Sequence, residues 1–247
     1  MKTTRSRSIV SNQNAPHPEL ETILRRHQTT PFRKPIARHT AQAFAAVDTI
    51  VHKRSAPLIL DSGCGTGDST QRLAEMHPHH FVIGVDKSEA RLSKNPFYSP
   101  LPGWLMASKH RDFQPDEASA QPSNLANNLF LVRADVIDFW RLALEHNWSI
   151  DKHYVLYPNP WPKKRQIKRR FHGHPVFFDM IRLAKYIELR SNWQIYAEEF
   201  AIALSIVAHQ KIAAEEIKVV QHYFSPFEKK YAESGHRLFR VAAEFRL

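Results

Sequence analysis

Hydrophobic and polar positions alternate along the chain between two patterns, one typical of buried strands and one typical of amphipathic helices. Short apolar runs predict strands at 57–61, 81–86, 128–135, 153–157, 193–198, 218–224 and 238–245. Helical spacing predicts helices at 41–51, after the first strand to residue 76, after the second strand to about residue 94, around 140–144, and at about 175–189 and 199–214. This alternation is typical of an α/β fold, in which helices cover both faces of a mostly parallel sheet. Because only a loop separates the last two predicted strands, the final strand is expected to run antiparallel.

Two segments interrupt this alternation. Residues 1–38 are polar and basic and contain four prolines, so we expect a basic N-terminal arm that is partly disordered. Residues from about 95 to 127 contain five prolines and many Ser, Asn and Ala residues, which is typical of a surface insertion. The sequence therefore predicts one folded domain over residues 39–247 that carries this insertion.

The charge balance favours a polyanionic partner. The formal net charge is +11 and the isoelectric point is about 9.8. We favour nucleic acid over an anionic membrane, because no amphipathic basic helix or lipidation signal stands out. No apolar run approaches the ~20 residues of a membrane span. The basic N-terminus lacks the apolar core of a secretory signal.

The cysteine and histidine content bears on compartment and metals. Cys64 is the only cysteine, which excludes an internal disulfide and makes a reducing, cytoplasmic setting the expectation. Histidines gather at 77–80 and 172–174. With one cysteine and no second ligand cluster in register, we expect both stretches to be surface loops and predict no metal site.

A glycine-rich turn follows the first predicted strand, in LILDSGCGTGDS (58–69), where Gly63, Gly65 and Gly67 fall within five residues. Glycine lets the backbone approach a ligand without a Cβ in the way. A dinucleotide fingerprint needs glycine at position 68, which is Asp68, so a nicotinamide dehydrogenase is a remote alternative. Asp61 at the strand end would repel phosphate and suits a cationic ligand, such as the amino acid part of S-adenosylmethionine.

Two further acids end the next two strands. Asp86 ends the second strand, where a carboxylate can accept hydrogen bonds from ribose hydroxyls. Asp135 ends the third strand and can accept from an adenine amino group. Each acid alone is more often a turn or cap residue. Three acids at successive strand ends beside a glycine turn indicate a ligand site, because ligands in open α/β sheets bind at that edge.

A charge run follows the fourth predicted strand, in YPNPWPKKRQIKRRFHGHP (157–175). Six of its eight central residues are cationic: Lys163, Lys164, Arg165, Lys168, Arg169 and Arg170. Taken alone, such a run is usually a solvated face. Strongly apolar sequence on both sides and three prolines before it favour a rigid loop that holds cations for a polyanion.

These motifs resemble known enzymes. D-x-G-x-G-x-G with a later strand-end acid resembles the class I S-adenosylmethionine-dependent methyltransferases. PNPWPKKRQIKRR resembles the [F/S]-D-P-W-P-K-K-R-H-x-K-R-R segment of the TrmB family, the bacterial tRNA (guanine-N7-)-methyltransferases. SPFEKKYAESGHRLFR (225–240) resembles their T-x-[FY]-E loop and following strand, and RSIV (7–10) faintly resembles their N-terminal R-S-F. The resemblance covers most of residues 40–247 and implies a Rossmann-like, seven-stranded, mostly parallel sheet with an antiparallel last strand.

The resemblance also implies roles for individual residues. It implies methyl transfer from S-adenosylmethionine to guanine N7 in the variable loop of tRNA. The cofactor would be held by Asp61, Gly63, Gly65, Gly67, Asp86 and Asp135, and Asn159 would sit between cofactor and base. The substrate would be handled by the cationic run, Glu198, Ser225, Phe227 and Glu228. Glu228 is the first candidate for holding the guanine N1–H and N2 donors, because a carboxylate also compensates the positive charge of the methylated ring.

Three positions depart from the family pattern. Asn159 and Ser225 stand where the family has Asp and Thr, and Ala197–Glu198 aligns with its Thr-Asp pair. One alternative is therefore a methyltransferase-fold protein that binds tRNA with little or no turnover. A second alternative is a methyltransferase that acts on another substrate, such as a small molecule. The sequence leaves the oligomeric state and the choice of tRNA open.

Overall fold

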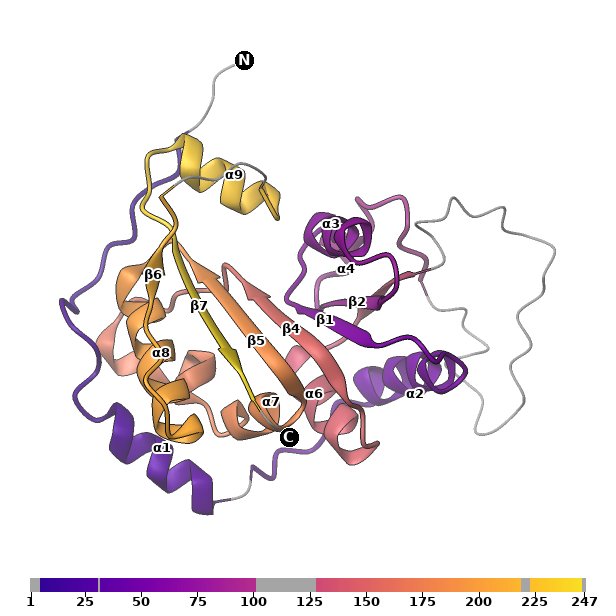
Figure 1. Cartoon of the computed structure of the whole chain (residues 1–247), viewed down its shortest axis with the longest axis horizontal. Coiled ribbons are helices and arrows are strands. Elements are labelled where there is room, and N and C mark those ends of the chain that lie inside the picture. The colour runs from indigo at the N-terminus through magenta and orange to yellow at the C-terminus, as the bar shows by residue number, and fades with distance from the viewer. Residues whose placement is uncertain (1–4, 31, 101–127, 219–222, 246–247) are drawn as a thin grey trace.

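One twisted sheet organises the chain, as the computed structural model shows (Figure 1). The structure describes residues 5–30, 32–100, 128–218 and 223–245. Its strands are β1 (Leu58–Ser62), β2 (Phe81–Asp86), β3 (Leu129–Arg133), β4 (Ile150–Leu156), β5 (Ala184–Ser191), β6 (Glu215–Glu216) and β7 (Phe239–Glu244). The order is β3-β2-β1-β4-β5-β7-β6, and the pairs among the first five strands are parallel. β7 pairs antiparallel with both β5 and β6. The predicted α/β class with an antiparallel last strand is confirmed.

Helices cover the sheet on both faces. They are α1 (Leu20–Thr29), α2 (Arg38–His52), α3 (Asp68–Met76), α4 (Glu89–Leu92), α6 (Val136–Glu145), α7 (Phe177–Arg182), α8 (Gln194–Ala208) and α9 (Pro226–Glu233), with 3-10 turns η2 (Lys164–Arg169) and η3 (Phe171–Gly173). Alternation along β1 shows the two layers, because Leu58 and Leu60 join one apolar core and Ile59 joins the other. α3 packs on β2 and β3, and α4 packs on β3, while α7 and α8 pack on β5.

The close approach of α3 to the sheet depends on Gly84 of β2. A Cβ at this position would come 2.3 Å from Oγ1 of Thr70 and 2.7 Å from Cδ2 of Leu131. The missing side chain therefore lets the helix that follows the glycine turn lie directly on β2, which fixes the turn at the carboxyl edge of the sheet.

The fifth strand lies earlier in the chain than the sequence pattern indicated. Residues 193–198, predicted as a strand, begin α8, and the strand is β5 at Ala184–Ser191. Lysine, glutamate and arginine in β5 made residues 175–189 resemble a helix, although Ile187 and Leu189 alternate with polar neighbours as strand residues do. Apolar residues occur nearly all round α8, so its helical period is hard to recognise.

The C-terminal region also departs from the prediction. A helix, α9, lies between the last two strands where only a loop was expected. Pro226 occupies its first turn, and the Ser225 side chain accepts a hydrogen bond from Glu228 N at 3.2 Å, so local capping starts this helix. Of the strand predicted over 218–224, residues 219–222 lie outside the described part, and β6 is Glu215–Glu216.

The N-terminal segment holds more structure than the expected arm. Residues 20–29 form α1, whose Leu20, Ile23 and Leu24 are buried against the body of the protein. α1 packs on α8, and the chain before it runs along the side of the molecule from α9 downward (Figure 1). Burial of these three apolar side chains supplies the stabilisation that the polar composition concealed.

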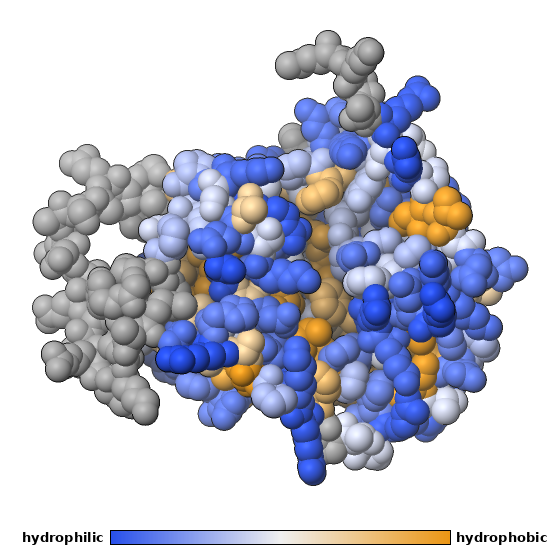
Figure 2. All heavy atoms as spheres, turned by 180° about the vertical axis from the view of Figure 1, so that it is seen from behind, coloured by the Kyte–Doolittle hydropathy of each residue, from blue (hydrophilic) through white to orange (hydrophobic). Residues whose placement is uncertain are grey.

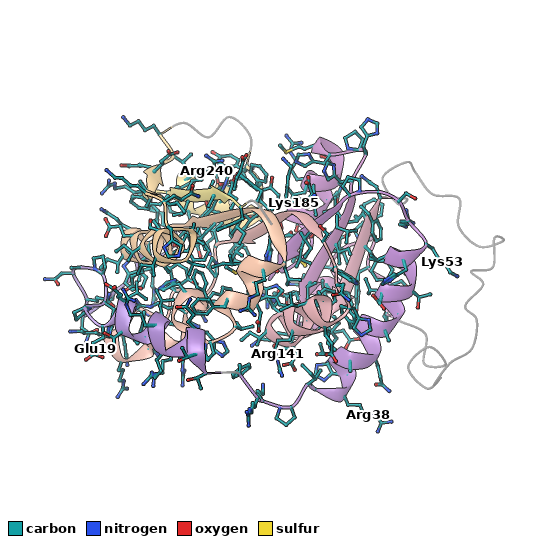
Figure 3. All side chains as sticks on the ribbon, turned by 60° about the horizontal axis from the view of Figure 1, so that its bottom comes forward. Glu19, Arg38, Lys53, Arg141, Lys185 and Arg240 are labelled. Carbon is teal, nitrogen blue, oxygen red and sulfur yellow. The ribbon has the colours of Figure 1, made fainter. Side chains whose placement is uncertain are left out.

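The face opposite to that of Figure 1 is mainly polar. Hydrophilic side chains cover most of the back face, and apolar side chains form small separate patches there (Figure 2). Lys185 and Arg240 lie on one side of the molecule, and Glu19 and Arg141 lie on the other (Figure 3). Among the described helices, none is long and apolar enough to cross a membrane. Most of the predicted insertion, residues 101–127, lies outside the described residues.

Candidate active site

A cavity of about 380 Å³ opens at the carboxyl edge of the parallel strands. Its size lies within the ~300–1,000 Å³ typical of small-molecule sites. The residues that line it are Ser62, Gly63, Asp86, Lys87, Arg91, Asp135, Val136, Ile137, Tyr157, Pro158, Asn159, Trp161, Arg169, Phe171 and Tyr196. The structure thus brings together residues from the ends of β1, β2 and β3 with the loop that follows β4.

The glycine turn forms one wall of this site. Gly63, Gly65 and Gly67 all have φ between 63° and 81°, a region that residues with a Cβ rarely adopt. At Gly67 a Cβ would also come 2.7 Å from Cδ1 of Leu131. Nothing lies within 4 Å of a Cβ position at Gly63, so the backbone there is open to a ligand. The predicted role of the turn fits this geometry.

Asp86 closes the second wall and is almost fully buried. Its Oδ2 accepts a hydrogen bond from Gly65 N at 3.0 Å, and its Oδ1 accepts one from Ser88 N at 2.7 Å. Arg91 forms an ion pair with Oδ1 at 2.8 Å. The carboxylate therefore orders the glycine turn as well as facing the cavity. Ribose hydroxyls that bind here must share it with the Arg91 guanidinium.

Asp61 lies beneath the turn and is fully buried. Its Oδ2 accepts from Ser69 Oγ at 2.5 Å and from Thr70 Oγ1 at 2.8 Å, which ties β1 to the first turn of α3. Its Oδ1 has no partner among the described residues. A buried carboxyl oxygen without a partner suits a donor supplied from outside the chain. Burial raises the pKa of Asp61 to about 6.

Asp61→Asn is expected to change how stability depends on pH. Burial raises the pKa from 3.8 to about 6, so the folded protein holds a proton that the unfolded chain releases at lower pH. This stabilisation is complete below about pH 4 and is lost as the pH rises through about 6. Between about pH 4 and pH 8 the unchanged protein should therefore lose about 2 kcal/mol of its free energy of unfolding through Asp61. The Asp61→Asn variant should not show this loss. Urea unfolding at the two pH values measures this difference, and parallel pH dependence of the two proteins would contradict it.

Asp135 and Asn159 complete the cavity wall. Asp135 is the N-cap of α6 and accepts from Ile137 N at 3.0 Å and Asp138 N at 3.3 Å through Oδ1. It combines the cap role and the cavity position that the sequence offered as alternatives. Asn159 is exposed, and its Oδ1 lies 3.4 Å from Trp161 N, which donates to it. Its side chain is therefore available at the cavity mouth.

A buried polar network under the cavity was missed by the sequence analysis. Ser62 Oγ accepts from Trp140 Nε1 at 2.9 Å and lies 2.7 Å from His153 Nε2. His153 is fully buried, and burial lowers its pKa to about 3, so its ring is neutral. The network fixes Ser62 on the cavity floor. The sequence did not reveal it, because its partners Trp140 and His153 sit in ordinary apolar stretches far from Ser62.

Glu228 does not face the cavity as the sequence analysis expected. It is fully buried, and its Oε1 accepts from Tyr157 Oη at 2.8 Å and from Arg190 Nη1 at 2.7 Å. Its Oε2 accepts from Phe224 N at 2.6 Å. With both oxygens bonded to the protein, the expected direct contact with guanine is wrong for this arrangement. Glu228 instead ties the start of α9 to the ends of β4 and β5.

Two other members of the loop before and within α9 lie nearer the turn. Phe227 is 44% exposed, and a Cβ added at Gly65 would come 3.6 Å from its Cε2 atom. Phe227 therefore offers an accessible aromatic ring beside the glycine turn. Ser225 caps α9, a role that its hydroxyl performs in place of the threonine of the family pattern.

Five of the six cations in the charge run are exposed, namely Lys163, Lys164, Arg165, Lys168 and Arg169. The guanidinium of Arg169 lies over the Trp161 ring, 4.7 Å from its centroid, at the cavity. Arg170 is an exception, because it is fully buried and forms an ion pair with Glu199. The prediction that Arg170 contacts substrate is therefore wrong.

Glu198 lies elsewhere than expected. It is within α8, where it accepts from Gln194 Nε2 at 2.7 Å, and it does not line the cavity. Because β5 ends at Ser191, the residues at the strand end are Ser191 and Asn192. The alignment of the family Thr-Asp pair with Ala197–Glu198 assumed a strand at 193–198. Because the strand is β5 and ends at Ser191, this alignment does not hold.

The histidine clusters do not form a metal site in the described part of the chain, where no group of three or more candidate ligands occurs. His172, expected on a surface loop, is fully buried, and its Nε2 lies 2.8 Å from Glu199 Oε2. The turn η3 buries His172 between α7 and α8. The residues next to His172 in the sequence gave no sign of this burial.

Comparisons with known proteins agree with the site. The chain matches a family model described as "Putative methyltransferase" over residues 106–241 and a "Methyltransferase domain" model over residues 53–96. The tRNA (guanine-N(7)-)-methyltransferase of Nitrosospira multiformis is 26% identical over 198 residues, which are 78% of this chain and 76% of that protein. The protein of the same name from Nitrosococcus oceani is 25% identical over 233 residues, 90% of this chain and 88% of that protein.

Solved structures show the same fold. An antibiotic-related methyltransferase superposes with a TM-score of 0.54 at 17% identity and covers 85% of this chain and 100% of its own. The 16S rRNA methyltransferase KamB gives a TM-score of 0.53 at 13% identity, with 82% and 94% covered. The first family model spans more than half of the chain and includes Asp135 and the loop after β4, and the second covers the glycine turn and Asp86. The chain therefore belongs to the TrmB family of methyltransferases.

Proposed function

We propose that this protein transfers a methyl group from S-adenosylmethionine to N7 of a guanosine in the variable loop of tRNA. One observation carries the proposal: a single loop, residues 158–170, belongs both to the cofactor cavity and to the exposed cationic run. Asn159, Trp161 and Arg169 line the cavity together with Asp86 and Asp135. A polyanion held by the run is thereby brought to the place where the cofactor is held.

The residues of the cavity fit S-adenosylmethionine. Asp86 offers a carboxylate for ribose hydroxyls, and the open backbone at Gly63 leaves room for the amino acid part. Asp61 lies beneath the turn and does not line the cavity, but its unpartnered Oδ1 can accept from a donor on the amino acid part, whose positive charge would favour the ionised carboxylate. When bound, the cofactor supplies a methyl group on a positively charged sulfur.

The chemistry requires positioning more than acid–base catalysis. Guanine N7 is a lone-pair acceptor that carries no proton, so no general base is needed to form the nucleophile. The N7 lone pair forms the new bond as the carbon–sulfur bond breaks, and the positive charge passes from sulfur to the purine ring. Positioning of two reactants can supply ~7–11 kcal/mol of the barrier. Asn159 at the cavity mouth and Phe227 beside the glycine turn are the residues we assign to holding the base.

The cationic run accounts for RNA recognition in this proposal. Five exposed Lys and Arg side chains within seven residues offer phosphate contacts that position the RNA without reading its sequence. Arg169 stacked on Trp161 joins this surface to the cavity. A tRNA substrate and a single, buried free cysteine favour a reducing, cytoplasmic setting as part of the same proposal.

Incubation of the purified protein with labelled S-adenosylmethionine and bulk tRNA tests the proposal. We expect label in the tRNA and a rate that falls steeply with salt. If the protein retains tRNA on a filter but transfers no label, it is a tRNA-binding protein without turnover. The amide at Asn159 is the observation that favours this alternative. Salt-insensitive transfer of label to an added mixture of small-molecule acceptors, with none to tRNA, would indicate a small-molecule methyltransferase.

Asn159→Asp is expected to raise the methylation rate. The amide oxygen can accept a hydrogen bond, but it offers no negative charge to the cationic centre. A hydrogen bond to a charged group is worth ~1.5–3 kcal/mol, against ~0.5–1.5 for a neutral one. The difference of about 1–1.5 kcal/mol, if exerted in the transition state, is about tenfold in rate. Single-turnover rates at saturating tRNA and cofactor measure it. An unchanged or lower rate in a variant that still binds both would show that Asn159 does not replace a catalytic carboxylate.

A further inference from the structure

A buried network centred on Glu199 joins three segments that are distant in the sequence. Glu199 Oε2 accepts from Arg170 Nη1 and lies 2.8 Å from His172 Nε2. Its Oε1 accepts from Gln13 Nε2 at 2.6 Å and from the backbone N of His17 at 2.9 Å. α8 thereby holds both the end of the cationic run and the N-terminal segment.

The charges of the network are matched inside the protein. Glu199, Arg170 and His172 are each 0% exposed, and Gln13 is 9% exposed. Burial alone would raise the pKa of Glu199, but the hydrogen bonds from His172 and Arg170 and the charge of Arg170 outweigh it and lower the pKa to about 2. The carboxylate is therefore ionised at any physiological pH. A buried ion pair of this kind is weak evidence for net stability, so its place in the fold needs another reason.

Arg170 holds the backbone of the loop that enters the cavity. Its Nη2 donates to Trp161 O at 3.1 Å and to Gln13 Oε1 at 2.9 Å, and its Nε donates to Trp161 O at 3.3 Å. Trp161 has φ 46°, a conformation that is strained for a residue with a large side chain. The buried guanidinium thus fixes the carbonyl of the residue that lines the cavity and stacks with Arg169.

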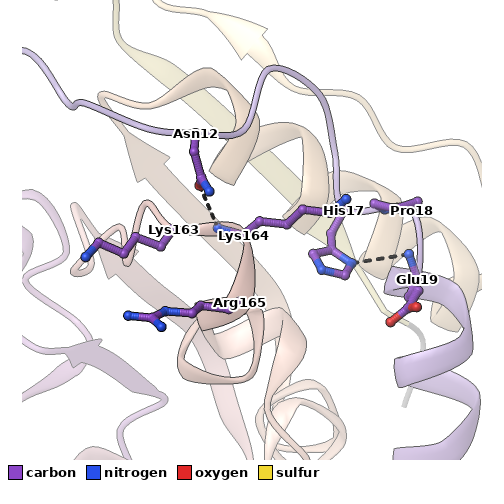
Figure 4. A pocket seen from close by; sticks show the side chains of 7 residues that line it. All are labelled: Asn12, His17, Pro18, Glu19, Lys163, Lys164 and Arg165. Carbon is purple, nitrogen blue, oxygen red and sulfur yellow. Dashed lines mark hydrogen bonds between the residues drawn. The ribbon is translucent and has the colours of Figure 1, made fainter.

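The N-terminal segment holds the same loop from outside through three consecutive residues. Ser11 Oγ donates to Pro162 O at 2.5 Å, and Asn12 Oδ1 accepts from Lys164 N at 3.1 Å. Gln13 then enters the buried network. Figure 4 shows the segment passing over the loop, with Lys164 extended along it toward His17 while Lys163 and Arg165 point away. The segment therefore leaves these two cations free to meet a substrate.

We propose that residues 11–17, together with Arg170 and Glu199, are positioning elements that hold the loop 158–165 in its substrate-binding form before the RNA arrives. The expected effect on the KM for tRNA rests on the proposed tRNA methylation. The expected ordering of the loop does not. Ordering a loop in advance removes the entropy that binding would otherwise have to overcome.

Gln13→Ala tests the proposal, with Ser11→Ala as a second, milder variant. Gln13→Ala removes the side chain that bonds both Arg170 and Glu199, and Ser11→Ala removes the bond to Pro162. The control is Glu21→Ala in α1, whose carboxylate is exposed and pairs with Arg25. We expect faster amide hydrogen exchange over residues 161–166 in both test variants and not in the control. The KM for tRNA should rise about fivefold to tenfold in Gln13→Ala, with the dissociation constant of S-adenosylmethionine unchanged.

The readouts separate the inference from a merely structural role and from the proposed function. A lower melting temperature with unchanged exchange at 161–166 and unchanged KM would overturn the inference. A change in kcat with KM unaffected would also overturn it, because the proposal assigns the segment to substrate capture. If the unchanged protein methylates no tRNA, the proposed function fails, and hydrogen exchange still decides whether the segment orders the loop.

Discussion

Asp86→Ala is expected to weaken S-adenosylmethionine binding at least about a hundredfold while the protein stays folded. The carboxylate lies at the end of β2 on the cavity wall, where it can accept from both ribose hydroxyls. Each lost charge-assisted hydrogen bond should cost ~1.5–3 kcal/mol, so two give a loss of about two orders of magnitude or more. Asp86 also accepts from Gly65 N, so its loss loosens the glycine turn as well.

Calorimetry with the cofactor measures this effect across a short series. Asp86→Asn keeps one acceptor oxygen and should fall between the unchanged protein and Asp86→Ala. Glu89→Gln is a matched control, because Glu89 is a nearby exposed carboxylate that pairs with Arg133 and does not line the cavity. Unchanged affinity in Asp86→Ala, or an equal loss in the control, would contradict the assignment of Asp86 to the cofactor.

Neutralising the exposed cations of the loop after β4 is expected to reduce tRNA affinity by about three orders of magnitude near 0.1 M salt. The five residues to change to Gln are Lys163, Lys164, Arg165, Lys168 and Arg169. If each contacts one phosphate, the slope of log affinity against log salt should fall by about 0.7–0.9 for each, or about 4 in all. Cofactor affinity should change little in a four-residue variant that keeps Arg169, because the other four cations do not line the cavity.

Two comparisons sharpen this result. Arg25→Gln with Arg72→Gln neutralises cations that pair with glutamates of their own helices, and the pair should leave the salt slope nearly unchanged. Arg170→Met should instead destabilise the fold by about 3–5 kcal/mol, because it leaves the Glu199 carboxylate buried without its partner. If the five-residue variant has the same slope of log affinity against log salt as the unchanged protein, the cationic run is only a solvated face.

The sequence predicted those parts of the site that depend on local signals. Gly63 and its neighbours occur where a strand ends and a helix begins, and the turn needs φ values that glycine provides. Asp86 and Asp135 each end an apolar run, so their meeting at one sheet edge follows from the parallel order of the strands. Proximity within the chain was sufficient for these predictions.

Other features depend on partners that the chain brings from far away. Nothing in a run of six cations indicates that Arg170 alone is buried, because its partner Glu199 lies 29 residues further along. Glu228 is held by a hydrogen bond from Tyr157, just after β4, and by an ion pair with Arg190 of β5, which no local pattern reveals. β5 was missed because one face of it carries charged side chains that pair with one another, as Glu188 does with Arg190.

A tRNA transcript made with 7-deazaguanine tests whether the methyl group goes to N7 of guanine. In this base a carbon replaces N7, so the lone pair is absent while the Watson–Crick edge and the phosphates are retained. The protein is incubated with S-adenosylmethionine and either the normal tRNA transcript or the substituted one, and the nucleosides are analysed by mass spectrometry. We expect 7-methylguanosine from the normal transcript and no methylation of the substituted one, with equal binding of both. Equal methylation of both transcripts, or a different methylated nucleoside from the normal one, would contradict it.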